Sequence, residues 1–571
     1  MKMSVASTLL ALGVGSALMG ASSAATAAPD YDGFVESTQY PIRVHYTEAA
    51  GLAAAEEVLG YAESGWATQI VQMGFPEPTT MNDQDEVVTG MWIYLDPAHG
   101  MDHPEAIGDN PDTPWTDCTA RVRISTLSPS SYLEMVTLHE MNHVLEYAAD
   151  CGEPHFALEQ TTVAVTTISE PDDSVFTHYM LPVFQQHPHH SLHCTFYNDQ
   201  DKFYFHYGSA LFQLFLEEAY GNYDGALLGS LWQAAKQTGT VTAVGMGGAI
   251  LDVPNEPDIF DAMNTVLGGV TLEEAYAEFA RWRAFVGTRD DGAHFSEGAS
   301  WAGGEVAIDT TLTLESLPVV QGVTQFQPNE LGSVFLSLDP FGLPADQGVR
   351  LAFDGDDAVT WTVDVLLVAA DGSAEVQTLA IDGAGQGALT VGPLGDAVEV
   401  LVIFTNLGDG TRDPELPHCA MGNGFVYDLT VEDLAAPPQV TGVDPAELTP
   451  GEDHYLWVAG ANFVEGLAVS FGGEGITVTQ VDFIDGETIG VAVQVADDAP
   501  SGSQDLTVTN PNAEQSTLAG AVTVVDGDGS TTEVTSCGCR LVGDDPTQPQ
   551  PWRIAALLSG LALLVSRRWR R

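Results

Sequence analysis

Basic residues are the scarcest class of side chain in this sequence. Lysine and arginine together number 17 against 80 aspartates and glutamates, which gives a formal net charge of −63 over 571 residues. The lysines are Lys2, Lys202 and Lys236. Proteins that bind nucleic acid need a basic surface for the phosphates, so the composition argues against that class. A lysine-poor acidic surface suits high salt or Ca²⁺-rich surroundings, where self-repulsion is screened.

Cysteine is also rare, and its six positions fall into separate groups. Cys118, Cys151 and Cys194 lie in the first half of the chain, Cys419 is isolated, and the last two form Cys537-Gly538-Cys539. In an oxidising compartment we expect one disulfide among the first three, and we favour Cys151 with Cys194. Spacing alone does not fix the connectivity.

The longest apolar runs lie at the two ends of the chain. Residues 1–27 carry Lys2, then an apolar run, then Ala25-Thr26-Ala27, which is the order of a secretory signal peptide and its cleavage site. The run is short for a helix that spans a bilayer, so a membrane anchor is the weaker interpretation. We therefore expect residues 1–27 to direct export.

The other end has the order cysteine, spacer, apolar run and arginine cluster. Cys537-Gly538-Cys539 precedes a Pro/Gln-rich spacer, the apolar residues 554–565 and the arginine-rich residues 567–571. By the positive-inside rule the arginines stay cytoplasmic and the rest of the chain lies outside. This tail resembles the MYXO-CTERM sorting signals of myxobacterial surface proteins, which implies anchoring to the cell envelope or processing near Cys537. A simple C-terminal transmembrane anchor is the alternative.

The most informative stretch is His139-Glu140-Met141-Asn142-His143, an H-E-x-x-H pattern. Residues four apart share one face of a helix, so His139 and His143 can offer two imidazole nitrogens to one Zn²⁺. Glu140 lies beside them and can act as a base. The surrounding residues 131–148 contain many apolar side chains and no glycine or proline, which predicts a buried helix. Two surface histidines that share a helix face by accident are the alternative.

A second helix is predicted over residues 156–165, after a short loop, and Glu159 on it is our candidate for the third zinc ligand. Two antiparallel helices can bring a carboxylate to the histidines of the first and leave a fourth position for water. In the alternative, Glu159 only favours the dipole at the helix N-terminus. The reserve ligands are Glu146, Asp150, His155 and Glu170. A metzincin arrangement is excluded, because Glu146 and Ala149 replace its required glycine and third histidine.

Three motifs together resemble the gluzincin-type secreted metalloproteases of myxobacteria over about residues 90–300. They are His139-Glu140-x-x-His143, Phe156-x-x-Glu159 and the run that starts at Tyr207-Gly208-Ser209. Phe156 stands where a tryptophan is usual, and Gln160 where a glycine is common. The resemblance implies a zincin-like fold and Zn²⁺ on the two histidines and Glu159. It also implies general-base catalysis by Glu140 on a protein or peptide substrate, and a donor such as Tyr207 for the oxyanion.

Residues 31–301 mix helical and strand periods. Helices are predicted over residues 51–71, 211–220 and 272–285, and strands over 91–95 and 121–125. A strand before the metal helix is the usual order in zincins, and a sheet edge there commonly holds the peptide substrate as an added strand. The histidine-rich residues 187–193 contain a proline that breaks helical spacing, so a solvated loop is favoured over a metal site.

The character changes at about residue 303, where short alternating strands are separated by Gly/Asp turns and predict a β-sandwich. Within it, Asp354-Gly355-Asp356-Asp357 is a candidate Ca²⁺ site, although acidic turns are mostly only turns. From residue 437 the chain resembles an IPT/TIG domain, which is an immunoglobulin-like sandwich. The residues that carry this likeness include Val443-Asp444-Pro445, Gly460-Ala461-Asn462-Phe463 and Val508-Thr509-Asn510-Pro511.

The sequence therefore predicts a multidomain protein with an α+β zincin-like metallopeptidase domain followed by two β-sandwich domains. The expected boundaries are 1–27 for the signal peptide, 28–302 for the metallopeptidase domain, 303–436 for the first sandwich, 437–526 for the IPT/TIG domain, and 527–571 for the linker and sorting tail. The expected function is a surface-anchored zinc metalloendopeptidase. The alternative is a surface adhesion or scaffold protein whose zinc site is structural or degenerate.

Overall fold

The computed structural model describes the chain in segments between residues 31 and 525. The predicted signal peptide, Cys151, Cys419 and the tail lie outside them. No helix in these segments is long and apolar enough to cross a membrane. The chain divides into two compact units between Ala436 and Pro437. The described segments are residues 31–81, 87–97, 103–109, 118–126, 132–150, 153–170, 175–196, 199–236, 257–301, 303–314, 319–321, 326–340, 347–394, 397–410, 424–433, 437–511 and 514–525.

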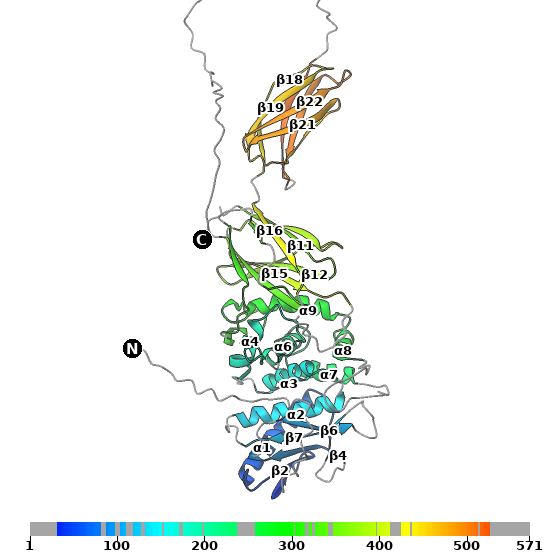
Figure 1. Ribbon diagram of the computed structural model, residues 1–571, viewed down its shortest axis with the longest axis vertical. Coiled ribbons are helices and arrows are strands. Elements are labelled where there is room, and N and C mark those ends of the chain that lie inside the picture. Colours follow the sequence, from blue (N-terminus) through cyan, green and yellow to red (C-terminus); the bar gives the residue numbers. More distant parts are fainter. Residues whose placement is uncertain are drawn as a thin grey trace, which may run out of the picture. The chain divides into compact units, whose positions relative to one another are not determined.

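A five-stranded mixed sheet opens the first unit (Figure 1). Its strand order is β1-β2-β5-β7-β6, with β2, β5 and β7 parallel and with β1 and β6 antiparallel at the edges. Alternate residues such as Val44, Ile93 and Val122 point into the core from one face. The strands are β1 (Gly33–Glu36), β2 (Ile42–Tyr46), β5 (Met91–Leu95), β6 (His103–Asp109) and β7 (Cys118–Ile124), and a hairpin is formed by β3 (Thr79–Met81) and β4 (Val87–Thr89).

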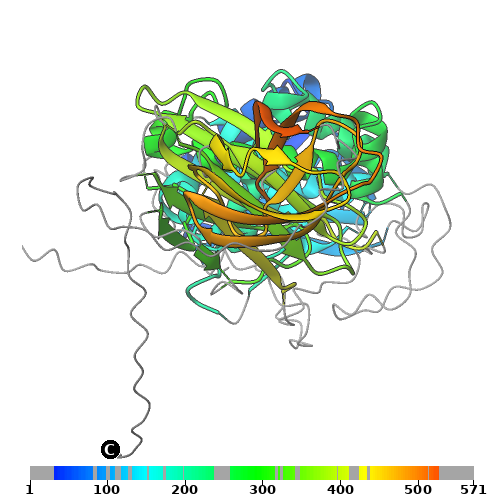
Figure 2. The ribbon, with the colours of Figure 1, turned by 90° about the horizontal axis from the view of Figure 1, so that it is seen from above.

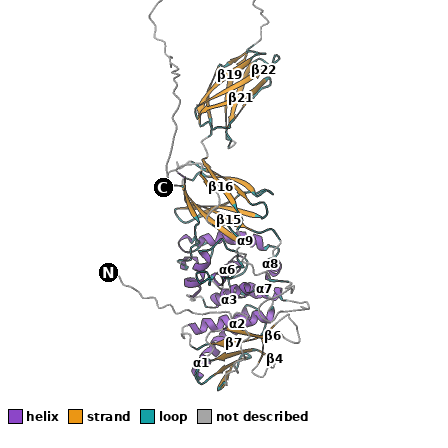
Figure 3. Ribbon diagram, viewed as in Figure 1, coloured by secondary structure: helices purple, strands orange, loops and turns teal. Residues whose placement is uncertain are grey.

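Helix α2 (Leu133–Ala149) lies between this sheet and the other helices, as Figures 1 and 3 show. It contacts β7 and α1 (Leu52–Gly65) on one side and α3 (His155–Ser169) on the other. A helix covered on two sides is apolar over most of its circumference, which explains why its sequence shows no single apolar stripe. The predicted helix over residues 51–71 is found as α1 and a π-helical continuation, η1 (Trp66–Gln72).

The remaining helices complete a helical half beyond α3. Thr271 and Glu274 form a capping box at the start of α9, and Asp258 caps α8 with its carboxylate. The helices are η4 (Phe176–Met180), α4 (Leu181–Gln185), α5 (Phe205–Gly208), α6 (Ala210–Ala219), α7 (Ala226–Ala235), α8 (Ile259–Val266) and α9 (Leu272–Trp282), followed by the short turns η5 (Arg283–Phe285), η6 (Gly287–Arg289) and η7 (Gly298–Ser300).

Two of the described cysteines form disulfides. Cys118, at the start of β7, and Cys194, in the loop that follows α4, are both disulfide-bonded. Cys151 lies outside the described residues, so its pairing with Cys194 stays a prediction. A disulfide needs its two Cα atoms within about 7 Å, and the fold decides which cysteines meet that condition.

Residues 187–193 form a loop, as predicted, but the prediction that this loop is solvated is wrong. His189 and His193 are buried. The loop passes beside the start of strand β10, where Ser333 N donates to Pro188 O and Leu192 N donates to Leu331 O. The polar side chains of this loop favour exposure to solvent, but the β-sandwich that packs against the loop buries it.

A β-sandwich follows the helices within the same unit. One sheet has the order β13-β12-β15-β10-β8 and the other β14-β11-β16-β9. The first sheet also packs on the helical half, where Arg281 lies 3.3 Å from Asp364 and Phe285 joins Leu366 and Leu401 in an apolar cluster. The strands are β8 (Thr310–Thr313), β9 (Val319–Gln321), β10 (Gly332–Asp339), β11 (Val349–Gly355), β12 (Trp361–Ala369), β13 (Ala374–Thr378), β14 (Gln386–Val391), β15 (Ala397–Asn406) and β16 (Tyr427–Asp433).

The second unit is a separate sandwich, drawn in yellow to red in Figures 1 and 2. Its sheets have the orders β17-β19-β22-β21 and β18-β24-β23-β20. Leu456, Val491 and Leu506 contribute to a core of its own. The strands are β17 (Gln439–Asp444), β18 (Glu447–Leu448), β19 (Asp453–Ala461), β20 (Ala468–Phe471), β21 (Ile476–Asp485), β22 (Thr488–Val495), β23 (Gly502–Thr509) and β24 (Gln515–Val524).

Candidate metal centre

Helix α2 places His139 and His143 one turn apart on the side that faces α3. Their ring centroids are 4.8 Å apart and the rings are nearly perpendicular, at 88°. Both side chains are buried. The helical spacing predicted from the H-E-x-x-H pattern is therefore present, and both imidazoles are withdrawn from bulk water.

Helix α3 brings Glu159 to the same point. Its Oε2 atom lies 3.4 Å from His139 Nε2 and 3.5 Å from His143 Nε2. Ligand atoms about 2.0–2.1 Å from a tetrahedral zinc ion are roughly 3.3–3.4 Å from one another. Among the described residues, these three side chains form the group of potential ligand atoms that converges, all within 4.8 Å. The donor set and its spacing thus fit one zinc ion.

Neighbouring side chains fix the orientation of His143. Glu146 Oε2 lies 2.9 Å from His143 Nδ1. Thr162 on α3 places its hydroxyl 3.1 Å from the same nitrogen and donates to Asn142 Oδ1 at 3.1 Å. A carboxylate at Nδ1 leaves Nε2 directed at the metal position, as in carboxylate–histidine–zinc arrangements. Glu146, a reserve ligand in the sequence prediction, therefore orients a candidate ligand, His143.

The charges in this cluster depend on one another. Burial alone would lower the pKa of His143, but the negative charge of Glu159 and the hydrogen bond with Glu146 hold it well above its usual range. Burial alone would raise the pKa of Glu159, but the charge of His143 and contact with His139 hold it well below its usual range. Burial raises the pKa of Glu146 to about 7. A metal ion that binds here therefore displaces a proton from His143.

The other carboxylate oxygen of Glu159, Oε1, contacts two further side chains. Tyr207, on α5, donates its hydroxyl to Glu159 Oε1 at 3.3 Å, and His155 Nε2 lies 3.3 Å from the same oxygen. Tyr207 is fully buried, whereas 31% of the His155 side chain is exposed. The structure therefore places Tyr207 against Glu159, the candidate third ligand, and His155 is more accessible to solvent than Tyr207.

The other predicted residues occupy distinct positions. Glu140 is buried beside His139 on α2 and is not part of the converging set. Asp150 and Glu170 stand at the C-caps of α2 and α3. Glu170 lies eleven residues beyond Glu159 on α3, which is about 16 Å along the axis. Sequence reasoning missed Thr162 and Asn142, although position 162 follows Glu159 by three residues and so shares its helix face.

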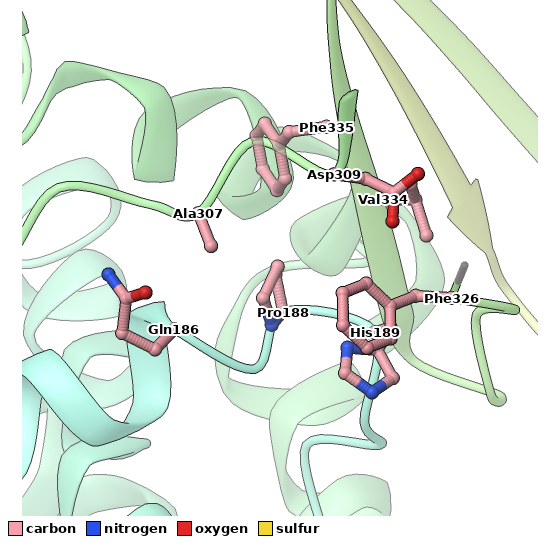
Figure 4. Close-up of a pocket in the computed structure, with 8 residues that line it drawn as sticks. All are labelled: Gln186, Pro188, His189, Ala307, Asp309, Phe326, Val334 and Phe335. Atoms are coloured by element: carbon pink, nitrogen blue, oxygen red, sulfur yellow. The ribbon is translucent and has the colours of Figure 1, made fainter. Parts of the chain in front are cut away.

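A small cavity lies away from this centre, at the junction of the loop after α4 with the sandwich (Figure 4). Its volume is about 10 Å³, which admits roughly one water molecule. His189 stacks on Phe326 there at 4.2 Å between ring centroids. The cavity is too small for a substrate.

The Ca²⁺ site predicted at residues 354–357 stays a prediction. In this turn the Asp354 carboxylate accepts a hydrogen bond from the Gln386 side chain, and the Asp356 carboxylate accepts one from Ala358 N.

The comparisons with known proteins bear on the second unit. Residues 438–524 match the model of the IPT/TIG domain family. The second unit carries an IPT/TIG domain. The sequence prediction for this part of the chain is confirmed, and the strands of both its sheets fall inside the match. No curated protein matches the chain.

Proposed function

We propose that the first unit is a zinc-dependent metallopeptidase with a zincin-like fold. The observation that carries the proposal is the convergence of His139, His143 and Glu159, with the carboxylate at tetrahedral spacing from both imidazoles and Glu140 adjacent on α2. A zinc ion held there would supply a Lewis acid and a water of lowered pKa. The antiparallel edge strand β6, which contacts α2, offers a place for an extended peptide substrate.

Side chains of the protein have the other roles in the proposed reaction. Glu140 takes a proton from the attacking water and passes it to the leaving nitrogen. Glu146 holds His143 in the tautomer that presents Nε2, and Tyr207 and His155 hold the outer oxygen of Glu159. His155, because it is partly exposed, is better placed than Tyr207 to donate to a developing oxyanion.

The test combines zinc analysis of the purified protein with a casein or gelatin assay that a chelator abolishes. Glu140→Gln is expected to retain zinc and lose activity, whereas His143→Ala loses both. Peptidase activity at the wild-type rate in Glu140→Gln would refute the mechanism. A protein that purifies without zinc, and whose unfolding temperature zinc does not raise, would refute the metal site itself.

A second candidate function is adhesion or scaffolding at the cell surface, which the IPT/TIG domain favours because such modules serve as spacers or binding surfaces. In that case zinc is bound and no peptide is cleaved, or no zinc is bound.

We also propose export and retention at the cell envelope through residues 527–571. Surface proteolysis of intact cells, compared between the full chain and a truncation at residue 526, tests this part separately.

A further inference from the structure

The IPT/TIG domain presents two large aromatic side chains to solvent on one face of the sheet β17-β19-β22-β21. Tyr455 and Trp457 lie two residues apart on β19, so both point to the same face. Their exposed fractions are 41% and 48%, and their ring centroids are 5.4 Å apart. Leu456 and Val458, on the opposite face, are buried in the core. Neighbouring exposed aromatic rings are typical of an interaction site.

The strand register identifies the residues around these rings. Trp457 lies opposite Asp444 on β17 and opposite Gly490 on β22, and Gly490 lies opposite Asp482 on β21. One row across the sheet therefore reads aspartate, tryptophan, glycine, aspartate. We call Asp444, Tyr455, Trp457 and Asp482 the aromatic face. It combines flat apolar surface with carboxylates on both sides.

The aromatic face is held in place by its own contacts. A Cβ atom at position 490 would lie 1.9 Å from the Tyr455 hydroxyl, so this hydroxyl lies over the β22 backbone where only glycine leaves room. From there Tyr455 donates to Asp482 Oδ2 at 2.8 Å, and Gln480 donates to Asp482 Oδ1 at 2.6 Å. The hydrogen bonds from Gln480 and Tyr455 lower the pKa of Asp482, so its carboxylate is ionised at neutral pH.

The charge of the domain selects the class of ligand. Residues 437–525 contain no lysine or arginine, whereas aspartate and glutamate recur throughout. Such a surface repels acidic glycans, anionic phospholipid headgroups and nucleic acid, and it attracts cations. A guanidinium group stacks well on an indole and pairs through its N–H groups with a carboxylate, which is the pair of contacts that this face offers.

We propose that the aromatic face binds an arginine-bearing segment of a partner protein. Trp457 provides the stacking surface, Asp444 and Asp482 pair with the cationic side chains, and Tyr455 fixes Asp482. Tryptophan, tyrosine and arginine are the residues that most often dominate protein interfaces. The inference rests on the second unit alone and is independent of the metal centre.

The experiment is a calorimetric titration of the full-length protein with a short blocked peptide in which arginine alternates with glycine, at low and at high salt. Matched peptides carry lysine or citrulline in place of arginine. Saturable binding is expected in the order arginine, lysine, citrulline. Trp457→Ala is expected to weaken arginine-peptide binding by about tenfold or more, and Asp482→Asn by a few-fold.

Asp505→Asn is the control, because it removes the same charge from an exposed position of strand β23, in the other sheet of the sandwich. It should leave binding within about twofold of the wild type. Circular dichroism confirms that each variant is folded. Three outcomes would overturn the proposal: no saturable binding, equal losses in Asp505→Asn and Asp482→Asn with none in Trp457→Ala, or Trp457-dependent binding of a neutral oligosaccharide in place of the arginine peptide.

Discussion

In the described part of the first unit, two clusters of histidines differ in the side chains that contact their rings. Glu146 and Glu159 contact His143 at the candidate metal centre. In the loop after α4, Phe326 stacks on His189 and the ring of Phe196 contacts His190. Carboxylates hold the pKa of His143 well above its usual range, whereas burial, followed by neighbouring positive charge, lowers the pKa of His189 to about 4 and of His190 to about 3.

The comparison shows that a high density of histidines is not by itself the mark of a candidate metal site. An imidazole among aromatic rings is kept neutral because its surroundings do not offset the free-energy cost of burying the charged form. An imidazole among carboxylates carries a proton that a divalent ion can replace. Acidic side chains on the neighbouring turns therefore distinguish a metal cluster from a packing cluster better than the number of histidines does.

The largest expected effect comes from removing the carboxylate that converges with the histidines. Glu159→Gln keeps the shape of the side chain but loses the charged ligand, so zinc affinity should fall by at least about a hundredfold. Competition with a chromophoric chelator measures it. His190→Gln is the comparison variant from the loop cluster. A similar loss in His190→Gln would mean that the two clusters do not differ as described.

A smaller loss is expected from Glu146→Gln, which leaves all three ligands intact but removes the carboxylate from His143 Nδ1. Zinc affinity should fall about 10- to 100-fold, because the orientation and basicity of His143 both change. Glu134→Gln on the first turn of α2 is the matched control. Equal zinc affinities in Glu146→Gln and the wild type would show that Glu146 does not support His143 in zinc binding.

The protonation of His143 predicts how zinc binding depends on pH. Since the metal-free site holds a proton on His143, zinc must displace it, and apparent affinity should fall about tenfold for each pH unit as the solution becomes more acidic. Calorimetry in two buffers of different ionisation enthalpy should show about one proton released per zinc at neutral pH. Zinc uptake without proton release would contradict the assigned charge state.

The loop cluster predicts a smaller effect, on stability in acid. The fold keeps His190 uncharged down to about pH 3, whereas the unfolded chain takes up a proton below about pH 6.5. Acid therefore favours unfolding, with a slope of at most about 1.4 kcal/mol per pH unit from this group. His190→Gln should reduce the dependence of urea unfolding on pH between about 6 and 4. The exposed His178→Gln serves as control, and equal slopes in both variants would contradict the prediction.

Local patterns predicted the elements that carry the site. The period of apolar residues placed α2 and α3 within a few residues of their observed ends, and the strand over residues 91–95 coincides with β5. The two histidines of the candidate set followed from helical spacing and one motif, and Glu159 from the expected pair of helices and the family resemblance. These features depend on residues that are close together in the chain, so they can be predicted from a single sequence.

Contacts between distant segments could not be predicted in the same way. The burial of His189 and the contact of Tyr207 with Glu159 both depend on how separate elements pack. Tyr207 was assigned to the site by resemblance, yet only the position of α5 shows which atom its hydroxyl meets. Thr162 left no sequence signal beyond its helical spacing from Glu159.

Cys118 and Cys194, both disulfide-bonded, come before α2 and after α3 in the chain. Covalent bonds therefore restrain the segment that carries the candidate ligands on both of its flanks. Disulfides restrict the unfolded chain, so they favour the folded state. A chain made where thiols stay reduced lacks these restraints, which ties maturation of the candidate metal pocket to the redox state of its surroundings.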